Sequence, residues 1–133
     1  MSRTILLVIV VFLQLIVCER KLAQPYQDSN DAVQLLVELS GRNRIDQVNR
    51  FNGSFKFHEC MKVYTREEFV DHFLRNANYK PFSSWSVSWA QYEAGSRKRI
   101  TMTVNAGGKK FNFKTRRSSE QFKLKFYSGD ILC

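Results

Sequence analysis

The sequence predicts an α+β domain in which N-terminal helices pack on a strongly curved antiparallel sheet. Helical spacing of apolar residues dominates the first part of the chain, with one early strand or hairpin between helices. Beyond a loop around Pro81, strict alternation of apolar and polar residues predicts strands throughout. Helices followed by hairpin-connected strands are typical of this class, because each layer covers the apolar face of the other.

The first 18 residues have the features of a secretory signal peptide. Arg3 supplies the positive charge, Ile5 to Val17 form the apolar run, and Cys18 is a small residue before the cleavage site. The run is shorter than the roughly 20 residues that a transmembrane helix needs. We therefore expect a secreted, extracellular protein with a signal peptide at 1–18, a polar leader at 19–27 and one domain at 28–133.

The first helix is expected from Asp28 to Ser40, because oxygen-bearing side chains at its start can cap free backbone N–H groups. Gly41 suits a left-handed residue after its last turn. Its predicted apolar stripe comprises Ala32, Leu35, Leu36 and Leu39. A short second helix is expected to end near Arg50, and three side chains would face one way: Ile45, Val48 and Phe51.

The early strand is expected between Phe51 and Val63, where Phe55 and Phe57 alternate with polar neighbours. The run from Thr65 to Glu68 then forms a capping box, in which the Thr and Glu side chains satisfy each other's backbone donors. It begins a third helix that is expected to end near Asn76. Its predicted buried face comprises Phe69, Val70, Phe73 and Leu74.

The remainder of the chain predicts a four-stranded antiparallel meander with one apolar face. Turn residues separate the strands, and Gly107-Gly108 is the strongest two-residue hairpin signal. The alternating apolar positions are Trp85, Val87 and Trp89; Ile100, Met102 and Val104; Phe111 and Phe113; and Phe122, Leu124 and Phe126.

This order of elements resembles the nuclear-transport-factor-like fold, a cystatin-like α+β cone shared with ketosteroid isomerase and scytalone dehydratase. The segment from Arg44 to Arg75 is the most similar, in particular to small secreted members found in nematodes. The motifs that carry the resemblance are Phe51-Asn52, Phe55-Lys56-Phe57, Cys60 and Tyr64-Thr65-Arg66-Glu67-Glu68-Phe69. The resemblance implies a cone whose interior faces the concave side of the sheet.

Enzymes of this fold use His, Asp or Tyr inside the cone for acid–base chemistry on small apolar substrates. The candidate residues of these types are Asp46, His58, Tyr64, His72 and Tyr92. His58 is out of phase with Phe57 and is expected to face away from the helices, and no His–Asp pair has a spacing that places both inside the cone. We expect no catalytic residue, no cofactor and, without a Cys/His cluster of ligand spacing, no metal site.

The aromatic stripe of the meander is expected to face the interior of the cone. Such a stripe suits a plain core and also suits a pocket for a small apolar ligand. The expected lining residues are Trp85, Trp89, Phe111, Phe113, Phe122, Leu124 and Phe126.

Basic residues give the chain a formal charge of +9 and concentrate between Gly95 and Gly129, where Glu120 is the sole acid. Such a segment favours an anionic partner, which outside the cell means a sulfated glycan, an anionic lipid or an acidic protein rather than nucleic acid. A solvated outer sheet face is the alternative interpretation. The expected polyanion-binding residues are Arg97, Lys98, Arg99, Lys114, Arg116, Arg117, Lys123 and Lys125.

Two covalent features follow from the predicted compartment. Cys60 and Cys133 remain after removal of Cys18 and are expected to form a disulfide. Asn52-Gly53-Ser54 is the only N-glycosylation sequon, and Asn52 is the expected acceptor.

The sequence therefore predicts a secreted, non-catalytic binding domain that takes a ligand in the cone cavity or a polyanion on a basic sheet face. One alternative is a small-molecule enzyme of the isomerase or dehydratase type. Another is a homodimeric structural module, because the open sheet face of this fold often pairs. The lysines expected on that face disfavour close packing of two copies without a bound anion.

Overall fold

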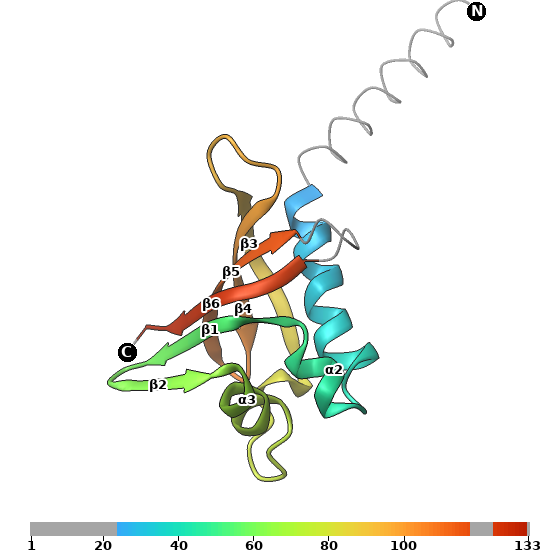
Figure 1. Ribbon diagram of the computed structural model, residues 1–133, viewed down its shortest axis with the longest axis vertical. Helices are drawn as coiled ribbons and strands as arrows, with labels where there is room; N and C mark the ends of the chain where they lie inside the picture. Colours follow the sequence, from blue (N-terminus) through green and yellow to red (C-terminus); the bar gives the residue numbers. More distant parts are fainter. Residues whose placement is uncertain (1–23, 118–123, 133) are drawn as a thin grey trace, which may run out of the picture.

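The fold is given by a computed structural model that describes residues 24–117 and 124–132 (Figure 1). The helical segments are residues 24–34, continuing into the π-helical turn η1 (Leu35–Leu39), then α2 (Arg44–Val48), α3 (Arg66–Phe69), η2 (Val70–Leu74) and the short η3 (Pro81–Ser83). The strands are β1 (Phe51–Glu59), β2 (Lys62–Thr65), β3 (Trp85–Tyr92), β4 (Arg99–Ala106), β5 (Lys109–Arg117) and β6 (Leu124–Ile131).

The six strands form one sheet in the order β2-β1-β6-β5-β4-β3. The meander β3 to β6 is antiparallel as predicted, and β1 and β2 form the early hairpin. β6 pairs in parallel with β1, so the sheet is mixed and not purely antiparallel. The N-terminal helix lies along one face of the sheet, with α2 and α3 at the lower end (Figure 1), which confirms the α+β class.

The first helix buries only part of the predicted stripe: Ala32 and Leu36 are buried, whereas Leu35 is half-buried. Its last turn is π-helical, and the Ser40 N–H donates to the carbonyl of Leu35, five residues back, at 2.8 Å. The wider turn changes the angular spacing of the side chains, so Leu39 is 73% exposed. The helix also includes residues 24–27, which were expected in the leader, and Gly41 lies against the Val37 carbonyl without a left-handed φ. The buried positions are Ser29, Ala32, Val33, Leu36 and Ser40.

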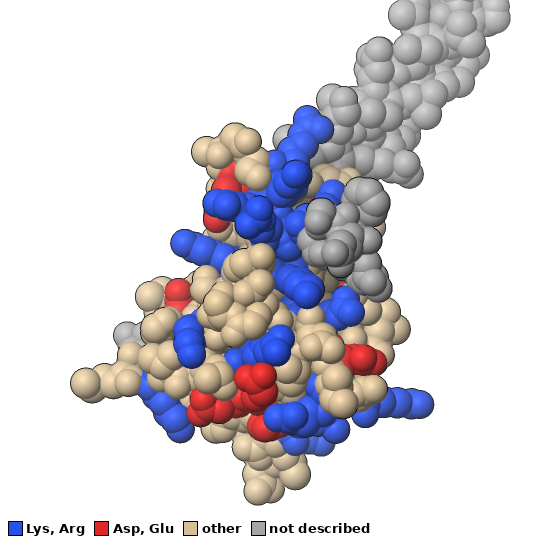
Figure 2. Space-filling model, viewed as in Figure 1, with Lys and Arg blue, Asp and Glu red and all other residues tan. Residues whose placement is uncertain are grey.

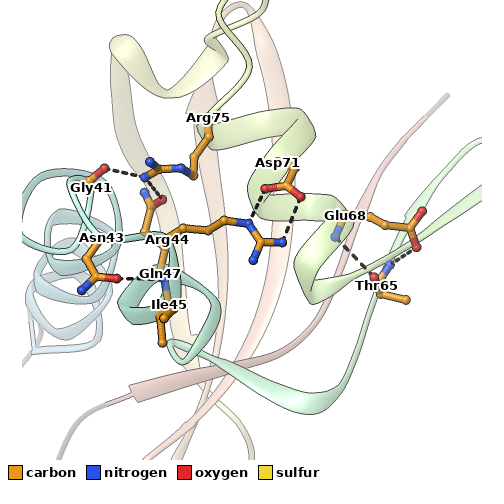
Figure 3. A network of polar contacts seen from close by, with 9 residues as sticks. All are labelled: Gly41, Asn43, Arg44, Ile45, Gln47, Thr65, Glu68, Asp71 and Arg75. Atoms are coloured by element: carbon orange, nitrogen blue, oxygen red, sulfur yellow. Dashed lines mark hydrogen bonds and ion pairs between the residues drawn. The ribbon is translucent and has the colours of Figure 1, made fainter.

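Polar contacts hold α2 against η2 (Figure 3). The Arg44 guanidinium donates two hydrogen bonds to the Asp71 carboxylate, at 2.7 and 3.0 Å, and these hydrogen bonds lower the pKa of Asp71. Arg75 donates to the Gly41 carbonyl at 2.9 Å and to the Gln47 amide oxygen at 3.1 Å. The second helix therefore forms as predicted, although Ile45, expected on its buried face, is exposed.

The capping box at the start of α3 is present as predicted: the Thr65 hydroxyl accepts from the Glu68 N–H, and the Glu68 carboxylate accepts from the Thr65 N–H (Figure 3). The helix ends in the π turn η2, where the Arg75 N–H donates to the Val70 carbonyl at 2.9 Å. The predicted face is correct, since Phe69, Val70 and Phe73 are buried.

Phenylalanine rings fill the space between the helices and the sheet. Phe57 contacts rings from β5 and from the third helix, with centroids 5.9 Å from Phe111 and 4.8 Å from Phe69. Phe51 packs on Phe126 at 5.2 Å, which joins the two parallel strands. Burying such rings provides the main stabilisation of the domain, at about 25 cal/mol per Å² of apolar surface.

Bulges in β3 and β6 reset the alternation of inward and outward side chains, and β1 also shifts its register with β6 between Phe51 and Lys56. In β3 the register with β4 shifts between Val87 and Trp89, so Ser88 is an extra residue. In β6 the register with β5 shifts at Tyr127. The first bulge corrects a prediction: Trp89, expected on the concave face with Trp85, lies on the outer face and is 42% exposed.

Glycine is required at two places in the sheet. Gly107 and Gly108 have φ angles of 57° and 77°, which suit the predicted two-residue hairpin between β4 and β5. Gly129 of β6 lies opposite both Phe57 and Phe113, and a Cβ there would be 2.8 Å from each ring. The absent side chain lets the rings on either side of β6 approach each other.

Several predicted features lie outside the described residues: the signal peptide at 1–18, most of the leader, Phe122, Lys123 and Cys133.

Cys60 is disulfide-bonded and has a φ of 54° in the two-residue turn between β1 and β2. Glu59 lies opposite Ile131, which brings the end of β1 beside the C-terminal end of β6. The pairing with Cys133 stays a prediction. Within the described ranges, no helix is long and apolar enough to cross a membrane.

We predict that Gly129→Ala lowers the free energy of unfolding by about 1–3 kcal/mol, because the added methyl group overpacks the ring cluster. Urea unfolding followed by fluorescence measures the effect. Gly53→Ala is the matched control, since a Cβ there meets nothing within 4 Å. Equal midpoints for the two variants would contradict the packing role of Gly129.

Candidate functional site

Three of the rings expected to line a cone cavity form part of the core. Phe111 and Phe126 are 0% exposed and Phe113 is 1% exposed. Phe113 lies 6.2 Å from Phe111 and 5.2 Å from Phe126, centroid to centroid, so these rings contact each other. Trp85 is half-buried at the edge of the cluster, and Leu124 is buried.

The acid–base residues considered from the sequence do not gather in one place. Asp46 is exposed on α2, and His58 is exposed on the outer sheet face, as its phase predicted. His72 is half-buried and stacks on Tyr64 at a centroid distance of 5.3 Å and an angle of 15°. In the described part of the chain, no group of three His, Cys, Asp or Glu side chains could hold a metal ion.

Tyr92 takes part in a contact that the sequence did not reveal. Its hydroxyl donates to the Asp28 carboxylate at 3.1 Å, and Arg117 donates to the same oxygen at 2.9 Å. Gln24 donates to the other oxygen at 2.7 Å. Burial raises the pKa of Tyr92, and the charge and hydrogen bond of Asp28 raise it further. This Asp28 network ties the N-terminal helix to β3 and β5, and it engages Arg117, one of the predicted polyanion-binding residues.

The remaining basic residues gather on the outer face of the sheet. Arg99 of β4 lies directly opposite Arg116 of β5, and Arg116 lies opposite Lys125 of β6. All three are exposed. We call Arg99, Arg116 and Lys125 the cation row. Like charges directly opposite each other on neighbouring strands destabilise a sheet, so the row raises the local positive potential at some cost to the fold.

A second line of outward residues runs beside the cation row. Lys114 of β5 lies opposite Ser128 of β6, and Ser128 lies opposite Lys56 of β1. Lys56 was not among the predicted binding residues. The alternation of β1 did indicate that it faces outward, but only the parallel pairing with β6 brings it to the same face as Lys114.

Two further cations lie in the loop between β3 and β4. Arg97 and Lys98 are exposed, and the Arg117 N–H donates to the Lys98 carbonyl at 2.7 Å, which holds the loop to the end of β5. Figure 2 shows Lys and Arg side chains gathered in the upper half of the view, with few acidic side chains among them. The basic patch comprises Arg97, Lys98, the cation row, Lys114 and Lys56.

Comparisons with known proteins support the fold. No family model matches the chain, and no curated protein matches it. Among solved structures, an NTF-2 like protein of unknown function from Silicibacter pomeroyi is 16% identical, with a TM-score of 0.51 over 86% of this chain and 97% of that one. A de novo designed protein with a curved β-sheet is 8% identical, with a TM-score of 0.53 over 80% of this chain and 99% of that one. At these identities the likeness shows the nuclear-transport-factor-like fold alone.

We predict that Tyr92→Phe lowers the free energy of unfolding at pH 7 by about 1 kcal/mol, because a half-buried hydrogen bond is lost. The raised pKa of Tyr92 means that the folded state favours the protonated phenol. Its contribution is therefore present below about pH 10 and is lost as the pH rises through the folded-state pKa. Urea unfolding at pH values from 7 to 11 measures the difference in free energy of unfolding between wild type and Tyr92→Phe. This difference should shrink as the pH rises, and a difference that stays constant would contradict the network.

Proposed function

We propose that the protein is a secreted, non-catalytic binding domain whose basic patch binds a sulfated glycan. The observation that carries this proposal is the cation row, in which three cations face each other in register on three adjacent strands. A polyanion laid across β4, β5 and β6 would contact all three at once. Guanidinium groups present planar pairs of donors, which suit the oxyanions of sulfate and carboxylate groups.

The choice of a glycan rests on the compartment that the sequence predicts. A chain with a signal peptide at residues 1–18 meets sulfated glycans at cell surfaces and in the extracellular matrix rather than nucleic acid. The resemblance to small secreted members of this fold favours the same location. In addition, Trp89 is the one exposed large apolar side chain among the described residues of β3 to β6, and a single such side chain suits contact with a soluble polymer better than insertion into a lipid surface.

A small apolar ligand inside the cone has less support. The three described phenylalanines that were expected to line a cavity, Phe111, Phe113 and Phe126, are almost fully buried and contact one another, as close packing of a core requires. An enzymatic role likewise has less support, since the Asp28 carboxylate that meets Tyr92 already accepts hydrogen bonds from Arg117 and Gln24.

We predict that replacing Arg99, Arg116 and Lys125 with Gln moves elution from a heparin column to clearly lower salt. The dissociation constant for heparin should rise at least tenfold, and the slope of its logarithm against log salt should fall by about 2–3, because each ion contact releases about 0.7–0.9 counterions. The variant should remain about as stable as wild type, since relief of repulsion within the cation row offsets the loss of the exposed ion pair between Arg99 and Glu93.

The matched control replaces Arg42, Lys62 and Lys80 with Gln, which removes the same charge from exposed positions outside the basic patch. Its elution should stay close to that of wild type. If both triple variants elute together, binding follows net charge alone and the basic patch is only a solvated surface.

We predict that protein secreted from eukaryotic cells begins near Glu19, carries a glycan on Asn52 and contains a Cys60–Cys133 disulfide. The Asn52 side chain is half-buried beside the exposed Gly53 and Ser54, and Cys60 is already disulfide-bonded. The intact mass before and after glycosidase treatment reports the N-terminus and the glycan. Peptide mapping under non-reducing conditions reports the disulfide. Retention of residues 1–17 would contradict secretion by a cleaved signal peptide, and two alkylatable thiols would contradict the pairing.

A further inference from the structure

A hollow on the outer face of the sheet has no role in the fold described above. Its volume is about 180 Å³, and it lies where β3, β4, β5 and β6 run side by side. This is below the roughly 300–1,000 Å³ of pockets that enclose a whole small ligand, so it suits one ring of a longer molecule. The residues around this Trp89 hollow are Trp89, Thr101, Thr103, Asn112, Lys114, Ser128 and Asp130, with Phe113 and Gly129 beneath them.

An exposed indole forms one wall of the hollow. The bulge at Ser88 turns Trp89 out of the core and places it opposite Thr103 on the outer face. Bulges commonly re-aim a side chain next to a functional site. Exposure of 42% of a tryptophan among polar neighbours forgoes burial of a large apolar surface, which a ligand stacked on the ring would recover.

Ordered polar groups lie beside the indole. The Thr103 hydroxyl donates to the Asn112 amide oxygen at 2.8 Å, and the Asn112 amide nitrogen donates to the Asp130 carboxylate at 3.1 Å. This chain fixes the orientation of the amide and presents alternating donors and acceptors along one row of three strands. Asp130 is exposed, so its carboxylate is accessible to hydroxyl donors from a ligand.

Lys114 joins the hollow to the basic patch. It lines the hollow and also lies two residues from Arg116 of the cation row, with Asn112, Lys114 and Arg116 on the same outward side of β5. Outward residues on a strand are about 6.6–6.8 Å apart, so a chain bound along β5 would pass from the hollow to the cation row within two such steps. A negative group near Lys114 and a neutral, hydroxylated ring over Trp89 would satisfy both regions.

We infer that the Trp89 hollow is the subsite for one sugar ring of an acidic glycan, an inference that rests on the function proposed above. The C–H face of the ring stacks on the Trp89 indole, its hydroxyls hydrogen-bond with Asn112 and Asp130, and its sulfate or carboxylate pairs with Lys114. A flat apolar surface beside polar groups of both kinds matches a pyranose ring, which has an apolar face and a hydroxylated edge. The Asp130 carboxylate also repels a polyanion that has no hydroxyls to offer, so the hollow distinguishes a glycan from a plain polyanion.

The test compares two ligands on three variants by isothermal titration calorimetry. The ligands are a size-defined heparin hexasaccharide and a linear polyphosphate of similar charge. The variants are Trp89→Ala, the control Tyr26→Ala, whose side chain is exposed to a similar extent at 39%, and the Gln triple variant of the cation row. Trp89→Ala should weaken hexasaccharide binding about threefold to tenfold, as expected for loss of one aromatic contact, and leave polyphosphate binding within twofold of wild type. Tyr26→Ala should change neither, and the triple variant should weaken both.

A second measurement does not depend on truncating the side chain. The hexasaccharide should shift the tryptophan fluorescence of the wild type, and Trp89→Phe, which keeps Trp85 as the remaining tryptophan, should lose most of that shift. If Trp89→Ala leaves hexasaccharide binding unchanged, or weakens both ligands equally, the sugar subsite is overturned while the polyanion function stands. If the triple variant weakens neither ligand, the proposed function fails, and the subsite fails with it.

Discussion

The placement of β6 between β1 and β5 is the constraint on which both the core and the candidate site depend. On the inner side, Gly129 lets Phe57 and Phe113 approach across the strand, and a Cβ at that position would collide with both rings. On the outer side, the same strand supplies Lys125, Ser128 and Asp130 to the middle of the sheet face. A C-terminal strand paired only with β5 would leave the core open and would separate Lys56 from Lys114.

The bulges in β3 and β6 decide which side chains the outer face presents. Tyr127 is the extra residue in β6; without it, the residues that follow would reverse faces and Asp130 would point into the core. Ser88 is the extra residue in β3, and it turns Trp89 outward and Ala90 inward, so that Ala90 is buried. Each bulge therefore reverses the facing of the residues that follow it in its strand, which sets both the outward and the buried positions beyond it. The hollow beside Trp89 is a product of these two local irregularities.

Local patterns predicted much of the fold but only part of the site. The capping box at Thr65 and the Gly107-Gly108 hairpin were predicted correctly, because each depends on residues within a few positions. The outward position of Trp89 was missed, since alternation carries no signal for an inserted residue. The contact of Asp28 with Tyr92 and Arg117 was missed as well, because these side chains lie 64 and 89 residues away along the chain and meet only through tertiary packing.

The energetics of the cation row favour a bound anion over a paired sheet face. Two like charges at directly opposed positions of neighbouring strands cost the fold a few tenths of a kcal/mol to about 1 kcal/mol. Salt reduces this cost, because the Debye length is about 8 Å at physiological ionic strength. A charge-assisted hydrogen bond from the same side chains to a sulfate contributes about 1.5–3 kcal/mol. A second copy of this face would instead double the number of opposed cations and bury some of them unpaired. The arrangement therefore costs the free domain little, gains most when an anion lies across the three strands, and disfavours direct face-to-face dimers.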